Sequence, residues 1–324
     1  MVARADLPSV RQLDGPLPIQ RSDIGPLNAL FSEAFTERYR RDGLVGVRVP
    51  PLNPAIWRYA IDDAAAGAML WRDDGGTIAA FNIAHRSGVE GWMGPLAVRD
   101  DCQGEGHGKM IVNAGIAWLQ GTGCRVIGLE TMPRTMENIG FYAGLGFVPG
   151  HLTVTLTVDA EHAAHSPRLL SALPSSARAD AVLACAALVS ASHPGYDYTR
   201  EIQLTHELAL GDTLLLFDGE ALGGFALCHA APLVEGRSRD ELRVLKLVLR
   251  DESYFDALVQ SLADLARRSG TARVAIRLQS EYGSVFRRLV SRGARVRWTD
   301  LRMSLAGYEE RMPATGVALS NWEI

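Results

Sequence analysis

The stretch that decides the fold is Val98-Arg-Asp-Asp-Cys-Gln-Gly-Glu-Gly-His-Gly-Lys109. It follows an apolar run of strand character and leads into a helix that we expect over residues 110–120. Its three glycines let the backbone bend and approach a ligand closely, so that successive N–H groups and the helix N-terminus can point at a phosphate. Lys109 adds a positive charge. The pattern predicts an anion-binding loop.

Two common phosphate-binding motifs do not fit this loop. A P-loop needs Gly at the position of Gln103 and Ser or Thr at that of Met110. The dinucleotide-binding pattern fails because Lys109 replaces its third Gly. What remains is Gln103-x-x-Gly106-x-Gly108, followed later in the chain by Phe141-Tyr142-Ala-Gly-Leu-Gly146-Phe147.

Together the two motifs resemble the GNAT superfamily of acyl-CoA-dependent N-acyltransferases. Between them lie an amphipathic helix, a Gly-containing turn and the strand-like run of residues 125–131, which is also the order of that family. The resemblance implies acetyl-CoA as the cofactor and direct transfer of an acetyl group to an amine of a small molecule or peptide. A non-catalytic acyl-CoA sensor or assembly module is the alternative.

The resemblance also implies roles for individual residues. The backbone of the strand before the loop would pair with the pantetheine arm of CoA, and the loop would take the pyrophosphate. The residues so assigned to the cofactor are Leu96, Ala97, Val98, Gln103, Gly104, Gly106, His107, Gly108, Lys109 and Asn138. Tyr142 would be the general acid at the thioester sulfur, and Glu130 the general base, with His85 and Glu90 as alternative bases.

The predicted elements occur twice along the chain. In the first half we expect helices at 27–41, 53–66, 110–120 and 135–145, and strands at 68–71, 78–85, 91–98, 125–131 and 151–158. In the second half we expect helices at 179–192, 199–208, 254–268 and 284–291, and strands at 212–217, 222–229, 241–249, 272–278 and 295–304. The fold class is α/β, with two tandem GNAT-like domains that are each a mixed, mostly antiparallel sheet flanked by helices.

The domain boundaries follow from composition. Residues 159–177, rich in Ala, His, Ser and Pro, are predicted to link a catalytic domain at 1–158 to a degenerate copy at 178–324. The copy has Leu249-Arg-Asp-Glu-Ser-Tyr254 in place of the glycine loop, without Gly and with two carboxylates that would repel a pyrophosphate. Phe286 stands in place of Tyr142.

Composition sets the remaining expectations. With 324 residues, 47% of them hydrophobic, the chain is long enough for two domain cores. A net charge of −4 does not favour a nucleic-acid or membrane partner. Residues 1–8 lack a signal-peptide core and no segment is a membrane span, so we expect a cytoplasmic protein. The four cysteines have no metal-ligand spacing, which predicts reduced, mostly buried thiols and no metal site. The sequence does not determine the oligomeric state, and a homodimer is compatible with it.

Overall fold

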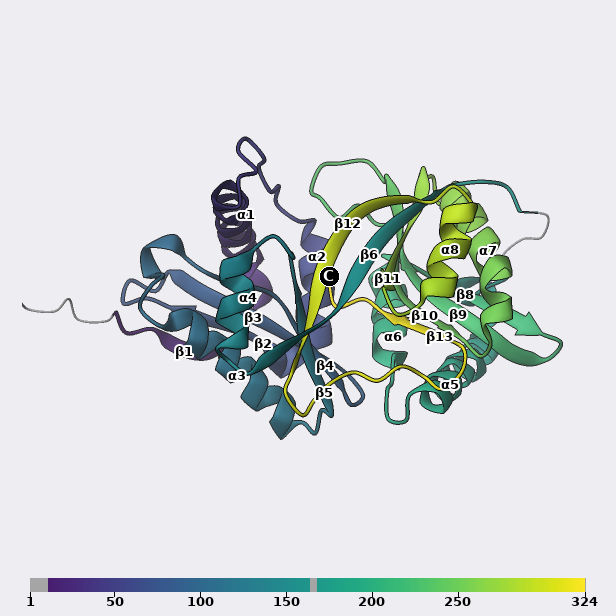
Figure 1. Cartoon of the computed structure of the whole chain (residues 1–324), viewed down its shortest axis with the longest axis horizontal. Coiled ribbons are helices and arrows are strands. Elements are labelled where there is room, and N and C mark those ends of the chain that lie inside the picture. Colours follow the sequence, from purple (N-terminus) through teal and green to yellow (C-terminus); the bar gives the residue numbers. More distant parts are fainter. Residues whose placement is uncertain (1–10, 164–167, 324) are drawn as a thin grey trace, which may run out of the picture.

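A computed structural model describes residues 11–163 and 168–323. The expected absence of a signal peptide in residues 1–8, and Pro167 of the predicted linker, lie outside these ranges. The described residues form one continuous sheet of 13 strands that runs through the whole molecule (Figure 1). Its order is β1-β2-β3-β4-β5-β12-β6-β11-β10-β9-β8-β7, and β13 pairs with β10 outside that path.

The elements follow the predicted order closely. The helices are α1 (Ile24–Arg41), α2 (Pro54–Ala64), α3 (His107–Gly121), α4 (Met136–Ala143), α5 (Ser175–Ser192), α6 (Thr199–Glu207), α7 (Phe255–Arg268) and α8 (Gly283–Ser291). The strands of the first half are β1 (Asp14–Pro18), β2 (Ala68–Arg72), β3 (Ile78–Ser87), β4 (Glu90–Val98), β5 (Val126–Thr131) and β6 (Phe147–Asp159). Those of the second half are β7 (Arg168–Leu169), β8 (Gly211–Asp218), β9 (Ala221–His229), β10 (Glu241–Leu249), β11 (Arg273–Gln279), β12 (Arg295–Leu305) and β13 (Val317–Ser320).

Helices cover both faces of the sheet because its strands are apolar on both. In β3, Phe81 and Ile83 point to the core beneath α1 and α2, whereas Ala80 and Ala84 point to the core beneath α3 and α4. Trp57 of α2 packs edge-on against Phe81, with 5.7 Å between ring centroids. In the second half, α7 and α8 cover one face and α5 and α6 the other.

The two halves share a core. Residues of α5 and α6 belong to one apolar cluster with Ile56 and Tyr59 of α2, Trp92 of β4 and Val126 of β5.

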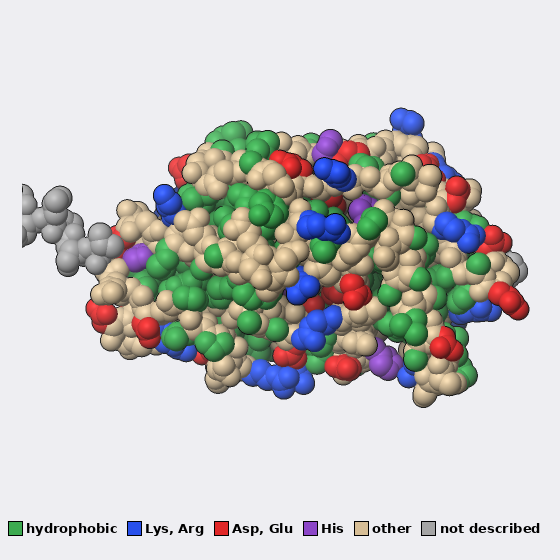
Figure 2. All heavy atoms as spheres, turned by 90° about the horizontal axis from the view of Figure 1, so that it is seen from below, with side chains coloured by type: hydrophobic (Ala, Val, Ile, Leu, Met, Phe, Trp, Pro, Cys, Tyr) green, Lys and Arg blue, Asp and Glu red, His purple; other side chains and the backbone are tan. Residues whose placement is uncertain are grey.

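On the face seen in Figure 2, cationic and anionic side chains lie among apolar ones, and neither sign covers it continuously. None of the helices within the described ranges is both long and apolar enough to cross a membrane.

The last long strands of the two halves are exchanged. β12 lies between β5 and β6, and β6 lies between β12 and β11 (Figure 1). Each half thus completes its sheet with a strand of the other. The division of the chain into domains at residues 1–158 and 178–324 stays a prediction. The sheet is continuous across this division, because β6 pairs with both β11 and β12.

The structure differs from the expected elements at a few ends. β6 begins at Phe147 rather than at residue 151. α3 begins at His107 rather than at residue 110, because Gly106, with a φ of +89°, caps the helix earlier. β1 and β13 lie in stretches for which no strand was predicted. All four cysteines are free and buried.

Candidate active site

The central feature of the first half is a fork between two strands. β4 and β5 pair in parallel from Glu90↔Val126 to Met93↔Leu129. Beyond this point β4 continues beside β3, whereas β5 continues beside β12. Within the described part of the chain, the edge of β4 at residues 96–98 therefore has no strand partner on the side of β5, and its backbone groups are available to an extended ligand. We call the place where the strands part the fork.

The glycine loop lies at the wide end of the fork. Gly104 and Gly106 have φ values of +80° and +89°, a backbone conformation that other residues seldom adopt. A Cβ built on either residue would meet no atom within 4 Å, so space is open beside this backbone. The N–H groups in the first turn of α3, from His107 to Lys109, have no partner within the helix. This open, donor-rich turn fits the pyrophosphate of CoA.

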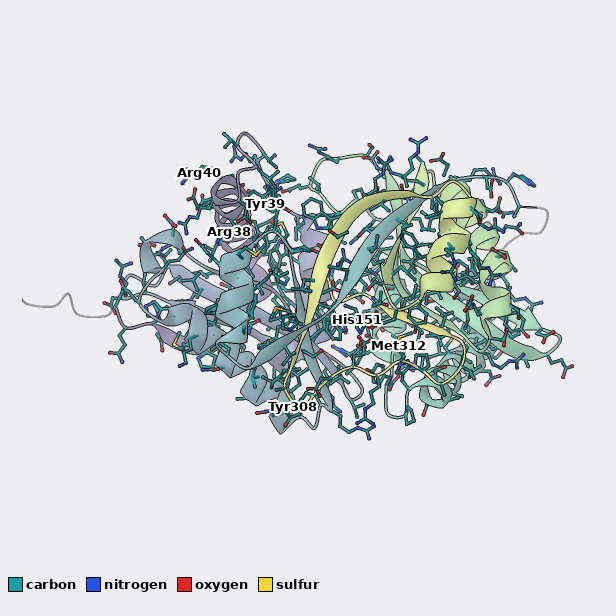
Figure 3. The ribbon with its side chains drawn as sticks, in the orientation of Figure 1. Arg38, Tyr39, Arg40, His151, Tyr308 and Met312 are labelled. Carbon is teal, nitrogen blue, oxygen red and sulfur yellow. The ribbon has the colours of Figure 1, made fainter. Side chains whose placement is uncertain are left out.

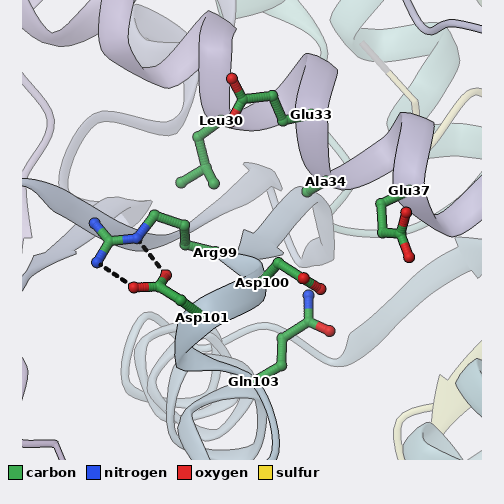
Figure 4. Close-up of a pocket in the computed structure, with 8 residues that line it drawn as sticks. All are labelled: Leu30, Glu33, Ala34, Glu37, Arg99, Asp100, Asp101 and Gln103. Carbon is green, nitrogen blue, oxygen red and sulfur yellow. Dashed lines mark hydrogen bonds and ion pairs between the residues drawn. The ribbon is translucent and has the colours of Figure 1, made fainter.

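Side chains hold the loop in place. Gln103 donates from Nε2 to the carbonyl oxygen of Val98 at 2.9 Å and accepts from Arg41 of α1 at 3.1 Å. The buried His107 contacts Glu105 at 3.3 Å, and Lys109 is exposed. Between α1 and this loop lies a pocket of about 370 Å³ (Figure 4). It is lined by Leu30, Glu33, Ala34, Glu37, Arg99, Asp100, Asp101 and Gln103.

Tyr142 stands at the fork on the face covered by α3 and α4. It shares one buried cluster with Met93 and Leu129, the last residue pair before the strands part. Burial raises the pKa of Tyr142 to about 12, so the phenol stays protonated at neutral pH. Its hydroxyl takes part in no hydrogen bond within the described ranges, so it is available to a ligand. Asn138, one turn earlier on α4, contacts Thr131 at 3.4 Å and borders the fork from the side of β5.

Glu130 follows Leu129 but points to the opposite face, into an ion cluster built by both halves. Its Oε2 accepts from Arg277 of β11 at 2.5 Å, its Oε1 lies 3.4 Å from Arg302 of β12, and Thr153 also donates to Oε1 at 2.5 Å. Burial alone would raise the pKa of Glu130, but the two guanidinium charges outweigh burial and lower it. Both carboxylate oxygens are therefore occupied, and the base role of Glu130 stays a prediction.

The alternative bases lie away from the fork in a second buried cluster. Nδ1 of His85 is hydrogen-bonded to Oδ2 of Asp63 on α2 at 2.6 Å. The imidazole ring stacks on the Trp92 ring, with 3.9 Å between the ring centroids. Glu90 accepts from the Trp322 indole at 2.7 Å, and its Oε2 lies 3.7 Å from Lys246 of β10. Among the residues that the structure describes, Nε2 of His85 and Oε2 of Glu90 have no hydrogen-bond partner.

This second cluster makes stability depend on pH. Burial, followed by the charge of Asp63, raises the pKa of Glu201 on α6 to about 8, against the opposing charge of Lys246. A carboxyl whose pKa is raised by folding contributes stability at acidic pH that is lost as pH rises towards the folded pKa. The difference in urea midpoint between Glu201→Gln and the wild type should therefore shift in favour of the variant as the pH rises from 5 to 8. Glu220→Gln, at an exposed turn, is the matched control, and equal pH dependence of both variants would contradict the expectation.

The second half repeats the fork but fills it. β10 pairs in parallel with β11 from Glu241↔Arg273 to Val244↔Ile276, and there the two strands part. On the freed edge, residues 246–249 pair with β13. A strand of this chain thus occupies the place that corresponds to the open edge of β4, and the following turn, residues 250–254, contains no glycine. Both features argue against a second cofactor site.

Within residues 11–163 and 168–323, no group of three or more His, Cys, Asp or Glu side chains could hold a metal ion. Phe286 of α8, which the sequence places in the position of Tyr142, packs against the apolar core of the second half.

The first half thus has a fork of two parallel strands with a glycine turn and a helix N-terminus at its wide end. Residues 29–147 of this half match the model of the acetyltransferase (GNAT) family. Members of this family are acyltransferases. No curated protein is detectably similar to the chain in sequence.

Solved structures match the whole chain in fold. A candidate acetyltransferase from Pyrococcus horikoshii has a TM-score of 0.68 at 12% identity, covering 99% of this chain and 98% of its own. A tandem GNAT protein from the clavulanic acid biosynthesis pathway has a TM-score of 0.56 at 10% identity, covering 89% and 97%. N-myristoyltransferase of Saccharomyces cerevisiae, with bound myristoyl-CoA, has a TM-score of 0.62 at 10% identity, covering 96% and 86%. At these identities the likeness establishes the fold, and the mixed α/β architecture with a large, mostly antiparallel sheet is confirmed.

Proposed function

We propose that the protein is an acetyl-CoA-dependent N-acetyltransferase that transfers the acetyl group directly to an amine of a small molecule or peptide. The open edge of β4 at residues 96–98, which leads from the glycine turn to Tyr142, carries this proposal. The β4 backbone would pair with the pantetheine arm. The turn at 103–109 would hold the pyrophosphate on its N–H groups, with Asn138 bordering the arm from the other side. Acetyl-CoA would supply the activated acyl group.

Tyr142 is proposed as the general acid. Its protonated phenol lies where the thioester sulfur would end, and a thiolate leaves more readily when a positioned acid gives it a proton. Met93, Leu129 and Tyr142 are all buried and close the narrow end of the fork, which suits a two-carbon acyl group better than a long chain. Direct transfer then needs only that the amine reach the fork from the opposite face, where Glu130 lies.

Titration of the chain with acetyl-CoA should give one binding site, because β13 fills the second fork. Release of free CoA thiol over a panel of amines then tests for transfer. Two sites of similar affinity would contradict the role given to β13. Binding without thiol release for any amine would favour the non-catalytic acyl-CoA sensor instead. Myristoyl-CoA serves as the comparison donor: a faster reaction with it would contradict the preference for acetyl.

A further inference from the structure

A pocket of about 360 Å³ lies where β5 ends and β12 continues past it. The loop after β5 and the first half of β12 form its walls, which are mostly apolar. The lining residues are Met132, Pro133, Arg134, Val296, Arg297, Trp298 and Thr299. Val296 and Trp298 keep 52% and 38% exposure, which is high for large apolar side chains in a sheet. Tyr39 of α1 adds a ring 6.3 Å from that of Trp298, and Figure 3 shows Tyr39 on the part of α1 near β12.

Asp300 connects this pocket to the fork. The Trp298 indole donates to Asp300 Oδ1 at 3.1 Å, and Arg277 donates to Asp300 Oδ2 at 2.9 Å. The same Arg277 nitrogen contacts Glu130, the residue that directly follows the fork. Asp300 and Arg302 lie two residues apart on β12, and Arg302 pairs with Glu130 across the strands. Asp300 therefore lies on the face of Glu130, one step nearer to the pocket.

Asp300 is the better placed of the two carboxylates to accept a proton. Arg277 is shared among Glu130, Asp300 and Glu323, which leaves an excess of negative charge around it. Burial, followed by the charge of Glu323, raises the pKa of Asp300 to about 7, against the attraction of Arg277. Its side chain keeps 10% exposure. Burial, followed by the charges of Glu323 and Asp300, raises the pKa of the Tyr39 phenol.

We propose that the acceptor is a primary amine on an apolar body, that this body lies in the pocket against Trp298 and Tyr39, and that Asp300 takes up the proton that the amine loses. The proposal rests on the proposed function. The entering ammonium group gives one proton to Asp300. Its nitrogen then forms a bond to the acyl carbon as the bond from that carbon to sulfur breaks. The sulfur receives a proton from Tyr142, and the second proton of the nitrogen reprotonates the phenol, so the net products are the amide, CoA thiol and one released proton.

The first test compares acceptors at saturating acetyl-CoA. Thiol release should show a kcat/KM for 2-phenylethylamine and hexylamine roughly tenfold or more above that for ethanolamine, as expected when an apolar pocket gains several methylene groups. Trp298→Ala should raise KM for the two apolar amines about tenfold. KM for ethanolamine should stay the same. A preference for amines that carry a carboxylate, lost on Arg134→Ala, would overturn the assigned acceptor class.

The second test concerns Asp300. Asp300→Asn should lower kcat roughly 10²-fold, the usual effect of losing a positioned base. It should also remove the acidic limb near pH 7 from the profile of kcat at saturating amine, and Asp300→Glu should restore part of the rate. Glu130→Gln should keep that limb, and Asp74→Asn, at an exposed turn, should behave as wild type. An Asp300→Asn enzyme with the wild-type limb overturns the proposal. If Asp300→Asn does not fold, a wild-type kcat that is flat between pH 6 and 8 overturns it as well. Thiol release from no amine would mean that the proposed function fails first.

Discussion

Replacing Gly106 with Val should reduce the affinity for acetyl-CoA by roughly 10²-fold or more, because a charge-assisted hydrogen bond contributes about 1.5–3 kcal/mol and more than one would be lost. Two properties of Gly106 produce this effect. The space beside its backbone is open, so a branched side chain would stand where the pyrophosphate needs to lie. Its φ of +89° caps α3, so the new side chain would also disturb the first turn, whose N–H groups are the donors.

The control must separate strain from ligand exclusion. Gly123, in the turn after α3, has a φ of +82° and nothing within 4 Å of a built Cβ. Gly123→Val should therefore carry a similar strain, of order 1–3 kcal/mol, at a distance from the loop. We expect both variants to lose comparable stability and only Gly106→Val to lose affinity in the titration. Equal affinity for the two variants would sink the loop assignment.

The elements of the fold could be predicted because their signals are local. Glycines at positions 104, 106 and 108 identify the turn whatever surrounds it, and the nearly continuous apolar run of β3 identifies a strand with two buried faces. The exchange of β6 and β12 has no such signal. The pattern of residues 147–159 is the same whether that strand pairs within its own half or with the other. The pairing partner is a property of the whole sheet.

The sequence predicted that the residues of the candidate cofactor site would lie together, but it did not predict the residues on the proposed acceptor side. The loop and Tyr142 belong to one contiguous part of the chain, and the structure brings them to one fork. Arg277 lies 147 residues after Glu130 in the chain, and Asp300 lies 23 residues after Arg277. The exchange of β6 and β12 brings the three residues together. One signal was available: Trp298, Asp300 and Arg302 alternate along a strand, which places polar groups on a face that the sheet buries.

The exchange also gives the second half a structural role in the first. β12 supplies the neighbour that β5 needs beyond the fork, and β11 supplies the neighbour of β6. Without β12, the edge of β5 at Glu130 would be open and the fork would have only one fixed side. The second half therefore holds the first half in its forked form, in addition to the role proposed for Asp300.

Tyr142→Phe should lower kcat roughly 10²-fold, the usual scale for removing a positioned acid, while leaving the affinity for acetyl-CoA within about twofold. The substitution removes one oxygen and keeps the ring that packs between Phe141 and Phe147 at 5.2 and 6.0 Å. Because the hydroxyl has no partner in the described part of the chain, stability should not fall. Single-turnover thiol release with the best amine, alongside urea denaturation, measures both quantities.

The pH dependence makes this expectation specific. With a pKa of about 12, Tyr142 should remain protonated throughout an assay from pH 6 to 10, so wild-type kcat should show no fall at alkaline pH from loss of this acid. An unperturbed phenol, with a pKa near 10, would begin to lose activity in that range. Tyr308→Phe is the matched control, since Tyr308 contacts the same apolar cluster from the loop after β12, away from the fork. A Tyr142→Phe enzyme as fast as Tyr308→Phe would exclude the phenol as the acid and leave protonation of the thiolate to solvent.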